Sequence, residues 1–297
     1  MMGIGSNHTG ERMGLNKKLL GKQYPPQDYG VTAEAVTNYA RAYNDDNPWF
    51  VDMDRVGGII APPMFGVVTS WLSIMMVMTD SELGVDVLRL LHSEQDMFFL
   101  RPLVPGDIIT SVAKIATVEE EARGESLAVE VHCTNQRREL VQRMVFTVFI
   151  RGRGSRERKR QRGAEPIPNR EPLLLVRQKI DEDQTFRYAS ASGDHNPIHV
   201  DENVAKMAGL PGIIVHGLCT MAFASKVMID HLCDHDPLKL RRLRARFSRP
   251  VFPGQEITTA VWPLLDHGDV KRYAYETHNP EGKDVIREGL AEITRKA

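Results

Sequence analysis

The sequence has few cysteines, no long apolar run and no excess of either charge. Its three cysteines, Cys133, Cys219 and Cys233, show no paired spacing and lie among apolar residues, so we expect reduced, buried thiols in a cytoplasmic protein. Because 38 basic residues are matched by 39 acidic ones, no global field favours nucleic acid or an anionic membrane as a partner. No stretch approaches the roughly 18 apolar residues of a membrane span, and residues 1–22 lack the apolar segment of a secretory signal.

What the sequence does contain is an internal repeat. Three segments of the first half recur in the same order in the second: Asn44–Asp52 as Gly193–Asp201, Gly58–Pro63 as Gly212–Gly217, and Arg101–Gly106 as Arg249–Gly254. The offsets are 149, 154 and 148 residues, so they differ only by loop insertions. Three collinear matches indicate a tandem duplication, and 297 residues are enough for two domains with a core each.

The boundary between the repeats is visible as a change in composition. A basic, glycine-containing run over 151–163 is followed closely by Pro166, Pro168 and Pro172, which is typical of an exposed linker. We therefore predict an N-terminal domain at 1–150, a linker at 151–172 and a C-terminal domain at 173–297. A nucleic-acid-binding tail is the alternative for the basic run, but the run is short, lacks aromatic residues and lies between domains.

Both halves show the same order of predicted elements. Capping and apolar patterns predict helices at 32–43, 182–190 and 202–208, long apolar helices at 64–78 and 218–233, and strands at 127–133, 243–247, 257–262, 270–277 and 285–294. One long helix followed by four antiparallel strands, twice over, predicts an α+β protein. The expected architecture is a tandem (double) hot-dog fold, in which each half is an antiparallel sheet wrapped around a long central helix.

One loop and the helix start that follows it carry the candidate chemistry. Asp194 and His199 lie five positions apart with Asn196 between them, and His216-Gly217 opens the second long apolar helix. A carboxylate and an imidazole in one loop can hold a water molecule between them. The Gly217 amide, at a helix start, can hold an oxyanion, and glycine lets a substrate approach the backbone closely. This combination suits adding water to, or removing it from, an activated double bond.

The motif also resembles that of a known family. Tyr188–His199 together with Ile214–Gly217 resembles the hydratase motif of the MaoC-like family, which includes R-specific enoyl-CoA hydratases (hydratase 2) and fatty-acid dehydratases. The resemblance covers roughly 178–293, and residues 19–151 look like the degenerate N-terminal dehydratase domain of double hot-dog members. It implies an acyl thioester substrate on coenzyme A or an acyl carrier, with no metal or redox cofactor. It also implies that Asp194 and His199 take the water proton and supply the proton to C2, without settling which residue does which.

We accordingly predict Asp194, His199 and Gly217 as catalytic residues. The predicted substrate-binding residues are Asn196, His216 and Arg249, the last of these in the repeated Arg-Pro segment. His216 either lines the site or braces the loop, and His195 is expected to point to solvent. Without its partners, the sequence Asp-x-Asn-Pro would indicate only an Asx turn.

The first half lacks the imidazole and the amide donor of this motif. Phe50 stands where the second half has His199, and Pro63, which has no amide hydrogen, stands where it has Gly217. Asp45 and Asn47 survive without partners, so we predict one active site per chain. The first half then serves packing, or it binds the acyl chain through the methionines of its long helix: Met64, Met75, Met76 and Met78.

Two further clusters have both a chemical and a structural interpretation. Arg241, Arg242, Arg244 and Arg246 form either a solvated strand face or a contact for coenzyme A phosphates. The cluster at 231–235, with His231 and His235, superficially suggests metal ligands, but at a helix end it is typical of a capping turn.

These observations favour a hydro-lyase that interconverts trans-2-enoyl-CoA and (R)-3-hydroxyacyl-CoA. The alternatives are a dehydratase of a branched, dicarboxylic or carrier-bound 3-hydroxyacyl thioester, and a non-catalytic acyl-thioester-binding subunit. A thioesterase shares the fold, but its reactive residues usually lie elsewhere. We expect an acyl-CoA substrate, no nucleic acid or membrane partner, and an assembly that allows a homodimer.

Overall fold

The computed structural model describes residues 14–87, 89–121, 123–152 and 167–295. Most of the predicted linker, residues 153–166, lies outside this part of the chain. None of the helices in the described ranges is long and apolar enough to cross a membrane.

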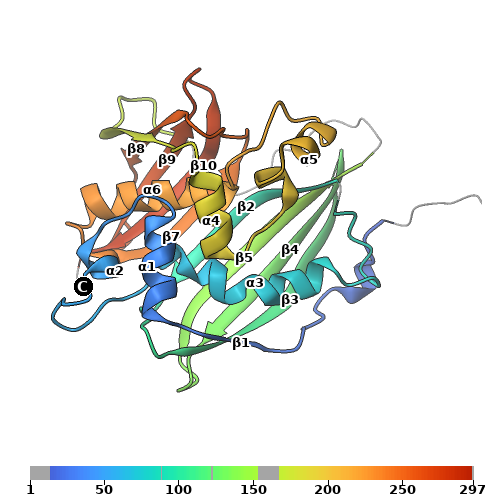
Figure 1. Cartoon of the computed structure of the whole chain (residues 1–297), viewed down its shortest axis with the longest axis horizontal. Coiled ribbons are helices and arrows are strands. Elements are labelled where there is room, and N and C mark those ends of the chain that lie inside the picture. The colour runs from blue at the N-terminus through green and yellow to red at the C-terminus, as the bar shows by residue number, and fades with distance from the viewer. Residues whose placement is uncertain (1–13, 88, 122, 153–166, 296–297) are drawn as a thin grey trace, which may run out of the picture.

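The two halves repeat one order of elements (Figure 1). The first half contains η1 (Lys17–Leu19), β1 (Gln27–Gly30), α1 (Ala33–Arg41), α2 (Pro48–Val51), η2 (Pro63–Phe65), α3 (Gly66–Met78), β2 (Leu90–Phe99), β3 (Ile108–Glu121), β4 (Gly124–Thr134) and β5 (Leu140–Arg151). The second contains β6 (Leu174–Lys179), α4 (Gln184–Ser192), η3 (Pro197–His199), α5 (Glu202–Met207), α6 (Gly217–Leu232), η4 (Pro237–Lys239), β7 (Leu240–Phe247), β8 (Glu256–Pro263), β9 (Val270–His278) and β10 (Asp284–Thr294).

The strands form one continuous ten-stranded sheet in the order β1-β3-β4-β5-β2-β7-β10-β9-β8-β6. The second five strands repeat the order of the first five in reverse, so the halves are related by an approximate two-fold axis at the β2–β7 pair. The prediction of four strands per half was one short, because β1 and β6 precede the long helices and form the two edges. β1 has only four residues, too few to produce a periodic signal.

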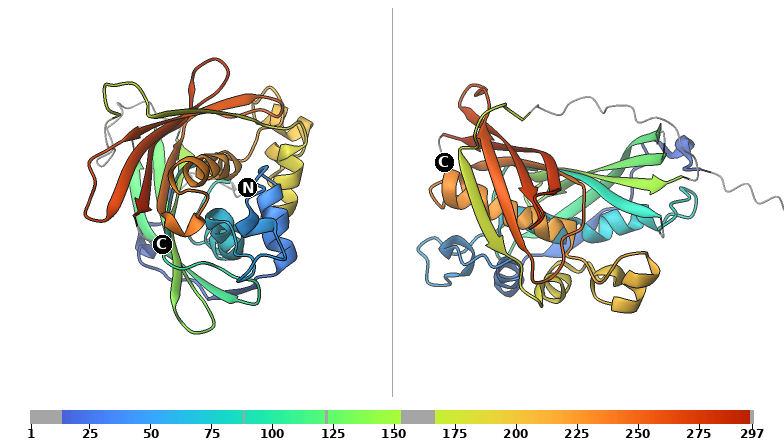
Figure 2. Two further views of the ribbon diagram at one scale, coloured as in Figure 1. Left: turned by 90° about the vertical axis from the view of Figure 1, so that its left-hand side faces the viewer. Right: turned by 90° about the horizontal axis from the view of Figure 1, so that it is seen from above.

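The sheet curves around the two long helices, α3 and α6, and α1 and α4 close its open side (Figure 2). α6 buries residues on every face, as the nearly uniform apolar pattern predicted. α1 packs on α4, where the hydroxyls of Tyr39 and Tyr188 lie 3.1 Å apart. These tyrosines are separated by 149 residues, the offset of the first repeated segment, so they meet at the approximate two-fold axis. The structure confirms the predicted tandem hot-dog fold.

On the basic face of β7, Arg242, Arg244 and Arg246 pair with carboxylates and Arg241 is exposed, and a contact with coenzyme A phosphates stays a prediction. Arg242 pairs with Asp96 through two hydrogen bonds of 2.9 and 2.8 Å, and Arg244 contacts Glu94 at 2.9 Å. Both carboxylates belong to β2, so these arginines join the two halves of the molecule. Arg246 pairs with Glu288 of β10 at 3.3 Å, within the second half. A single-sequence pattern shows the alternation of charge but not the acidic strand opposite.

Candidate active site

The loop after α4 is shaped by hydrogen bonds from its own side chains. α4 ends at Gly193, whose φ of 79° is the left-handed conformation that glycine adopts without strain. The Asp194 carboxylate then accepts a hydrogen bond from the Asn196 amide at 3.1 Å. The Asn196 side-chain oxygen in turn accepts one from the Ile198 amide at 3.3 Å and caps η3. The Asx turn is therefore real, and it fixes the positions of both Asp194 and His199.

His199 is held in one tautomer. Its side chain is buried, and its Nδ1–H donates to the Ile214 carbonyl at 2.7 Å, which leaves a lone pair on Nε2. The Thr185 hydroxyl of α4 donates to the His199 carbonyl at 2.7 Å and anchors the backbone. Burial lowers the pKa of His199 below 6.5, and the nearby Asp194 carboxylate opposes that shift. His199 is thus poised as a neutral proton acceptor.

His216 connects this loop to α6. Its ring stacks on His199 with centroids 3.8 Å apart, and its Nε2–H donates to the Asp194 carbonyl at 2.9 Å. It is 1% exposed, and burial, together with the neighbouring His199, lowers its pKa to about 3. This geometry braces the loop against the helix, and it also places the His216 ring beside Asp194 and His199, so a role in lining the site stays a prediction.

The three groups converge on one point. A carboxylate oxygen of Asp194 and ring nitrogens of His199 and His216 all lie within 4.8 Å of one another. His216 directs one nitrogen to a carbonyl and the other, at 3.4 Å, towards the Thr185 hydroxyl, so two groups face the space between them. Catalytic metal ions usually take three protein ligands, and the arrangement suits a bound water better. Burial raises the pKa of Asp194, and His199 opposes the shift.

Gly217 is the first residue of α6, next to these groups, and its N-cap His216 makes no side-chain capping hydrogen bond. The amides of this first turn therefore lack intrahelical partners. A Cβ at Gly217 would lie 3.2 Å from the Phe247 ring at the end of β7. The sequence suggested that glycine leaves room for a substrate, but the contact that requires it in this structure is with Phe247. Sequence reasoning missed Phe247 because nothing local links β7 to the start of α6.

The remaining predicted positions lie outside this cluster. His195 is exposed, as expected. Arg249 is also exposed and donates from its guanidinium to the Asp284 carbonyl at 3.2 Å. At the end of α6, Asp234 and His235 have φ values of 54° and 60°, and His235 contacts Asp230 at 3.3 Å. That is the geometry of a helix-ending turn.

Both halves match models of dehydratase domains. Residues 164–283 match the MaoC-like domain, and residues 18–144 match the FAS1-like dehydratase domain region. Enoyl-CoA hydratase 2, peroxisomal, of Arabidopsis thaliana is 31% identical over 216 residues, which cover 69% of this chain and 68% of that protein. The chain belongs to the MaoC-like dehydratase family.

A second relative agrees with this membership, and a solved structure shows the same fold. Probable enoyl-CoA hydratase 2 of Dictyostelium discoideum is 29% identical over 93% of this chain and 96% of its own length. The MaoC-like dehydratase of Phytophthora capsici superposes with a TM-score of 0.84 at 23% identity, over 96% of this chain and 99% of that one, and so shows the same fold.

The first half of this MaoC-like chain has turned its remaining motif residues into structural contacts. Asp45 is 2% exposed and lies 3.4 Å from the ammonium of Lys226, which belongs to α6 of the other half. Asn47 donates to the His235 carbonyl at 3.0 Å, again across the halves. Phe50, at the His199 position, is fully buried. Sequence reasoning missed Lys226, because a single lysine in a long helix gives no signal of its partner.

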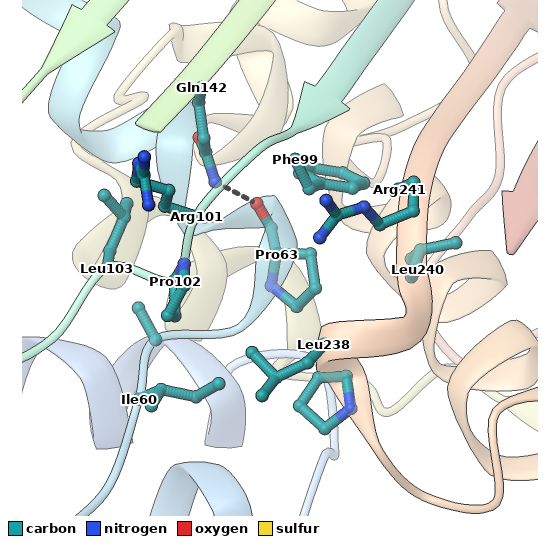
Figure 3. A pocket seen from close by; sticks show the side chains of 12 residues that line it. Ile60, Pro63, Phe99, Arg101, Pro102, Leu103, Gln142, Leu238, Leu240 and Arg241 are labelled. Carbon is teal, nitrogen blue, oxygen red and sulfur yellow. Dashed lines mark hydrogen bonds between the residues drawn. The ribbon is translucent and has the colours of Figure 1, made fainter. Parts of the chain in front are cut away.

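The start of the first long helix is covered by a side chain of the protein itself (Figure 3). A small pocket of about 30 Å³, open to solvent, lies here between the halves. Gln142 of β5 donates to the Pro63 carbonyl at 2.9 Å. Its side-chain oxygen is 1.6 Å from the point where a Cβ on Gly66 would lie, so it sits directly against the first residue of α3. The start of α6 is partly exposed at Gly217 in the second half, whereas the start of α3 is covered by Gln142 in the first half.

Asp45→Asn should therefore cost stability and spare turnover. Removing one member of a buried ion pair costs about 3–5 kcal/mol, but Lys226 keeps Asp230 at 3.0 Å, so we expect a loss of about 1–3 kcal/mol. Urea unfolding and hydration assays measure the two effects. Asp46→Asn is the matched control, because Asp46 also contacts Lys226 but is 96% exposed. A loss of turnover with Asp45→Asn as deep as that with Asp194→Asn would contradict the single-site prediction.

Proposed function

We propose that this protein is a hydro-lyase that interconverts trans-2-enoyl-CoA and (R)-3-hydroxyacyl-CoA at one site per chain. The observation that carries the proposal is the convergence of Asp194 and the free Nε2 of His199 beside the start of α6. The relatives named enoyl-CoA hydratase 2 support the thioester substrate, and the resemblance of the Tyr188–His199 motif to that of R-specific hydratases supports the R configuration. The residue roles rest on the geometry of this chain.

The chemistry follows from where charge develops. Water attacks C3 of the enoyl thioester, the C2–C3 π electrons move towards the carbonyl, and negative charge collects on the thioester oxygen. The unpaired amide of Gly217 and the positive end of the α6 dipole stabilise that enolate. Such a donor contributes most when it is aimed in advance at the oxygen that becomes charged.

The Asp194–His199 pair holds the water and manages its proton. Asp194 offers a carboxylate and His199 an unprotonated Nε2, so together they accept one proton as the C3–O bond forms. The pair then returns a proton to C2, and the enolate collapses to the saturated thioester. Burial pushes the pKa of Asp194 up and that of His199 down, which brings their proton affinities closer together.

A direct assay tests the function. We expect the purified protein to remove the enone absorbance of a trans-2-enoyl-CoA and to give the (R)-3-hydroxyacyl-CoA on chiral analysis. The reverse reaction should start from the R isomer and not from the S isomer. An absence of hydration across short and long enoyl chains, or a predominantly S product, would overturn the proposal.

The acidic limb of the pH profile of kcat/KM should be displaced to lower pH. Hydration requires Asp194 ionised and His199 neutral, so binding a proton to the pair removes activity as the pH falls. Because burial lowers the pKa of His199 below 6.5, the midpoint of the acidic limb of kcat/KM should lie below pH 6.5. A profile already halved at or above pH 6.5 would show that this histidine is not held neutral by its surroundings.

Location and assembly belong to the same proposal. The cysteines at 133, 219 and 233 are all buried and unpaired, which suits a reducing compartment, and we assign the enzyme to the cytoplasm. Relatives with peroxisomal names make fractionation of the native host the appropriate test. A homodimer is the assembly we propose, and light scattering of the purified chain measures it.

A further inference from the structure

An unsatisfied polar side chain lies inside the sheet near the active site. Gln95 of β2 is 1% exposed, and neither its side-chain nitrogen nor its oxygen has a hydrogen-bond partner among the described residues. Its neighbours across the sheet are Ala245 of β7 and Phe146 of β5. Burying a carboxamide among such residues without partners is costly. An orphaned group of this kind needs an explanation.

The group is connected to the catalytic centre by a short chain of contacts. Gly217 packs against the Phe247 ring, whose centroid lies 4.8 Å from that of His92. The His92 ring also stacks on Phe146 at 4.1 Å, and Phe146 is the residue directly opposite Gln95. His92 is thus separated from the oxyanion donor by one aromatic ring, and Gln95 lies beyond it, opposite Phe146; we call His92 and Gln95 the polar pair.

The internal repeat shows that this polarity is not required by the fold. At the offset of 148 residues that relates Arg101 to Arg249, the counterpart of Gln95 is Leu243. Leu243 is fully buried in the equivalent place on β7. The same site in the same sheet is therefore filled by an apolar side chain in one half and a carboxamide in the other.

The polar pair carries no charge. Burial lowers the pKa of His92 to about 3, although the Glu94 carbonyl and the Gln95 side chain, which lies beside the ring without a hydrogen bond of normal geometry, both oppose the shift, so the ring is neutral. The direct neighbours, Ala245, Phe146 and Phe247, are apolar. A neutral carboxamide and a neutral imidazole offer a donor and acceptors to an uncharged oxygen group, whereas a carboxylate would enter this region without a cation.

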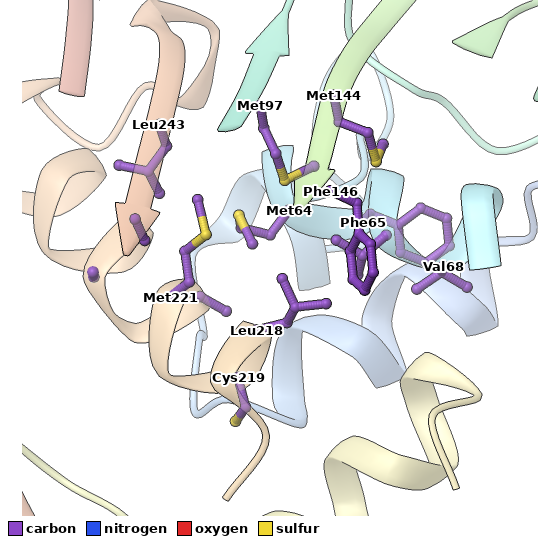
Figure 4. Close-up of a cluster of buried hydrophobic side chains, with 14 of the residues drawn as sticks. Met64, Phe65, Val68, Met97, Met144, Phe146, Leu218, Cys219, Met221 and Leu243 are labelled. Carbon is purple, nitrogen blue, oxygen red and sulfur yellow. The ribbon is translucent and has the colours of Figure 1, made fainter. Parts of the chain in front are cut away.

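The surrounding core can make room for a ligand. Figure 4 shows Phe146 and Leu218 in one buried cluster with four methionines, Met64, Met97, Met144 and Met221. Methionine side chains are unbranched and change conformation readily, so they can move aside for an acyl chain. The cluster lies between the sheet and the long helices, next to the polar pair.

We propose that His92 and Gln95 form a polar subsite that selects 2-enoyl thioesters whose acyl chain carries an uncharged oxygen group, a hydroxyl or a keto group. This inference rests on the proposed hydratase function. With the thioester at Gly217, the acyl chain runs past Phe247 and brings its oxygen group to the Gln95 carboxamide. An unsubstituted chain leaves that carboxamide without a partner and binds less well.

A panel of thioesters tests the subsite. Oct-2-enoyl-CoA is compared with its hydroxy and keto derivatives, substituted at successive carbons beyond the double bond, and with the corresponding dicarboxylic thioester. We expect one substituted position to exceed oct-2-enoyl-CoA by about tenfold in kcat/KM, the effect of one added hydrogen bond. The dicarboxylic thioester should be the poorest of the panel.

Variants separate recognition from packing. Gln95→Leu, which copies Leu243, should bring the kcat/KM ratio of the preferred substituted thioester to oct-2-enoyl-CoA to about one or below, and should raise the melting temperature. Gln95→Met serves the same purpose if leucine prevents folding. Gln142→Leu is the matched control, because it removes a buried glutamine of the same sheet from the covered start of α3 and should leave the preference intact.

The outcomes are distinct. A wild-type protein that hydrates oct-2-enoyl-CoA but prefers none of the substituted chains overturns the subsite and leaves the hydratase standing. Gln95 variants that keep the wild-type preference also overturn it. A wild-type protein inactive on the whole panel overturns the hydratase itself.

Discussion

Asp194→Asn and His199→Ala are each expected to lower kcat for enoyl-CoA hydration by about 10²–10⁴-fold, the usual contribution of a general acid–base group. Both groups face the water between them, and neither has a neighbour able to replace it, because His216 directs its Nε2–H to the Asp194 carbonyl. Asn at 194 can still accept the turn hydrogen bond from the Asn196 amide, so the loop should keep its shape.

The controls for these variants lie in the same loop. His195→Ala removes an exposed imidazole next to Asp194 and should leave turnover unchanged. His199→Ala also removes the stacking on His216 and the bond to Ile214, so its melting temperature has to be measured beside its activity. A folded Asp194→Asn or His199→Ala protein with wild-type kcat would remove the pair from the mechanism.

Gly217→Pro should lower kcat by about 10²–10³-fold, the cost of losing one oxyanion donor. Proline is tolerated at the first position of a helix, and His216 before it has a ψ of 136°, the extended conformation that a residue preceding proline adopts. The substitution therefore deletes the amide hydrogen without breaking α6. Because the enolate carries more charge than the ground-state carbonyl, kcat should fall more than KM rises.

Gly217→Ala is the matched control for the donor. It keeps the amide but brings a methyl group to 3.2 Å from the Phe247 ring, so we expect an intermediate loss caused by displacement of that ring. Shortening the ring in Gly217→Ala/Phe247→Leu should recover part of the activity, whereas Phe247→Leu should not rescue Gly217→Pro. A folded Gly217→Pro protein with full turnover would place the oxyanion at another donor.

Much of the fold could be predicted from the sequence because the duplication repeats the same segments in both halves. The Asp-x-Asn-Pro turn, the apolar helices and the alternating strands are local patterns, and all three appear in the structure close to their predicted bounds. The family and the fold followed from the motif beginning at Tyr188 and are confirmed by the comparisons. The assignment of roles to Asp194, His199 and Gly217 stays a prediction.

The contacts between the halves could not be predicted in the same way. Arg242 with Asp96 and Lys226 with Asp45 each join segments that are far apart in the sequence. Such pairs depend on how β2 meets β7 and how α6 crosses the first half, neither of which has a local signal. The two edge strands were missed for a simpler reason, since short strands at a boundary resemble loop.

The pairing of Asp45 with Lys226 makes it hard for the first half to regain an active site in evolution. Asp45 has no catalytic partner in the first half, and its carboxylate instead contacts Lys226 of the half that carries Asp194 and His199. Restoring the first site would now need a histidine at Phe50, an amide donor at Pro63 and a displaced Gln142, as well as release of Lys226. No single change among these restores activity, and releasing Lys226 alone costs stability. The duplicated chain therefore keeps one active site, and the contact of Lys226 with Asp45 stabilises the half that has none.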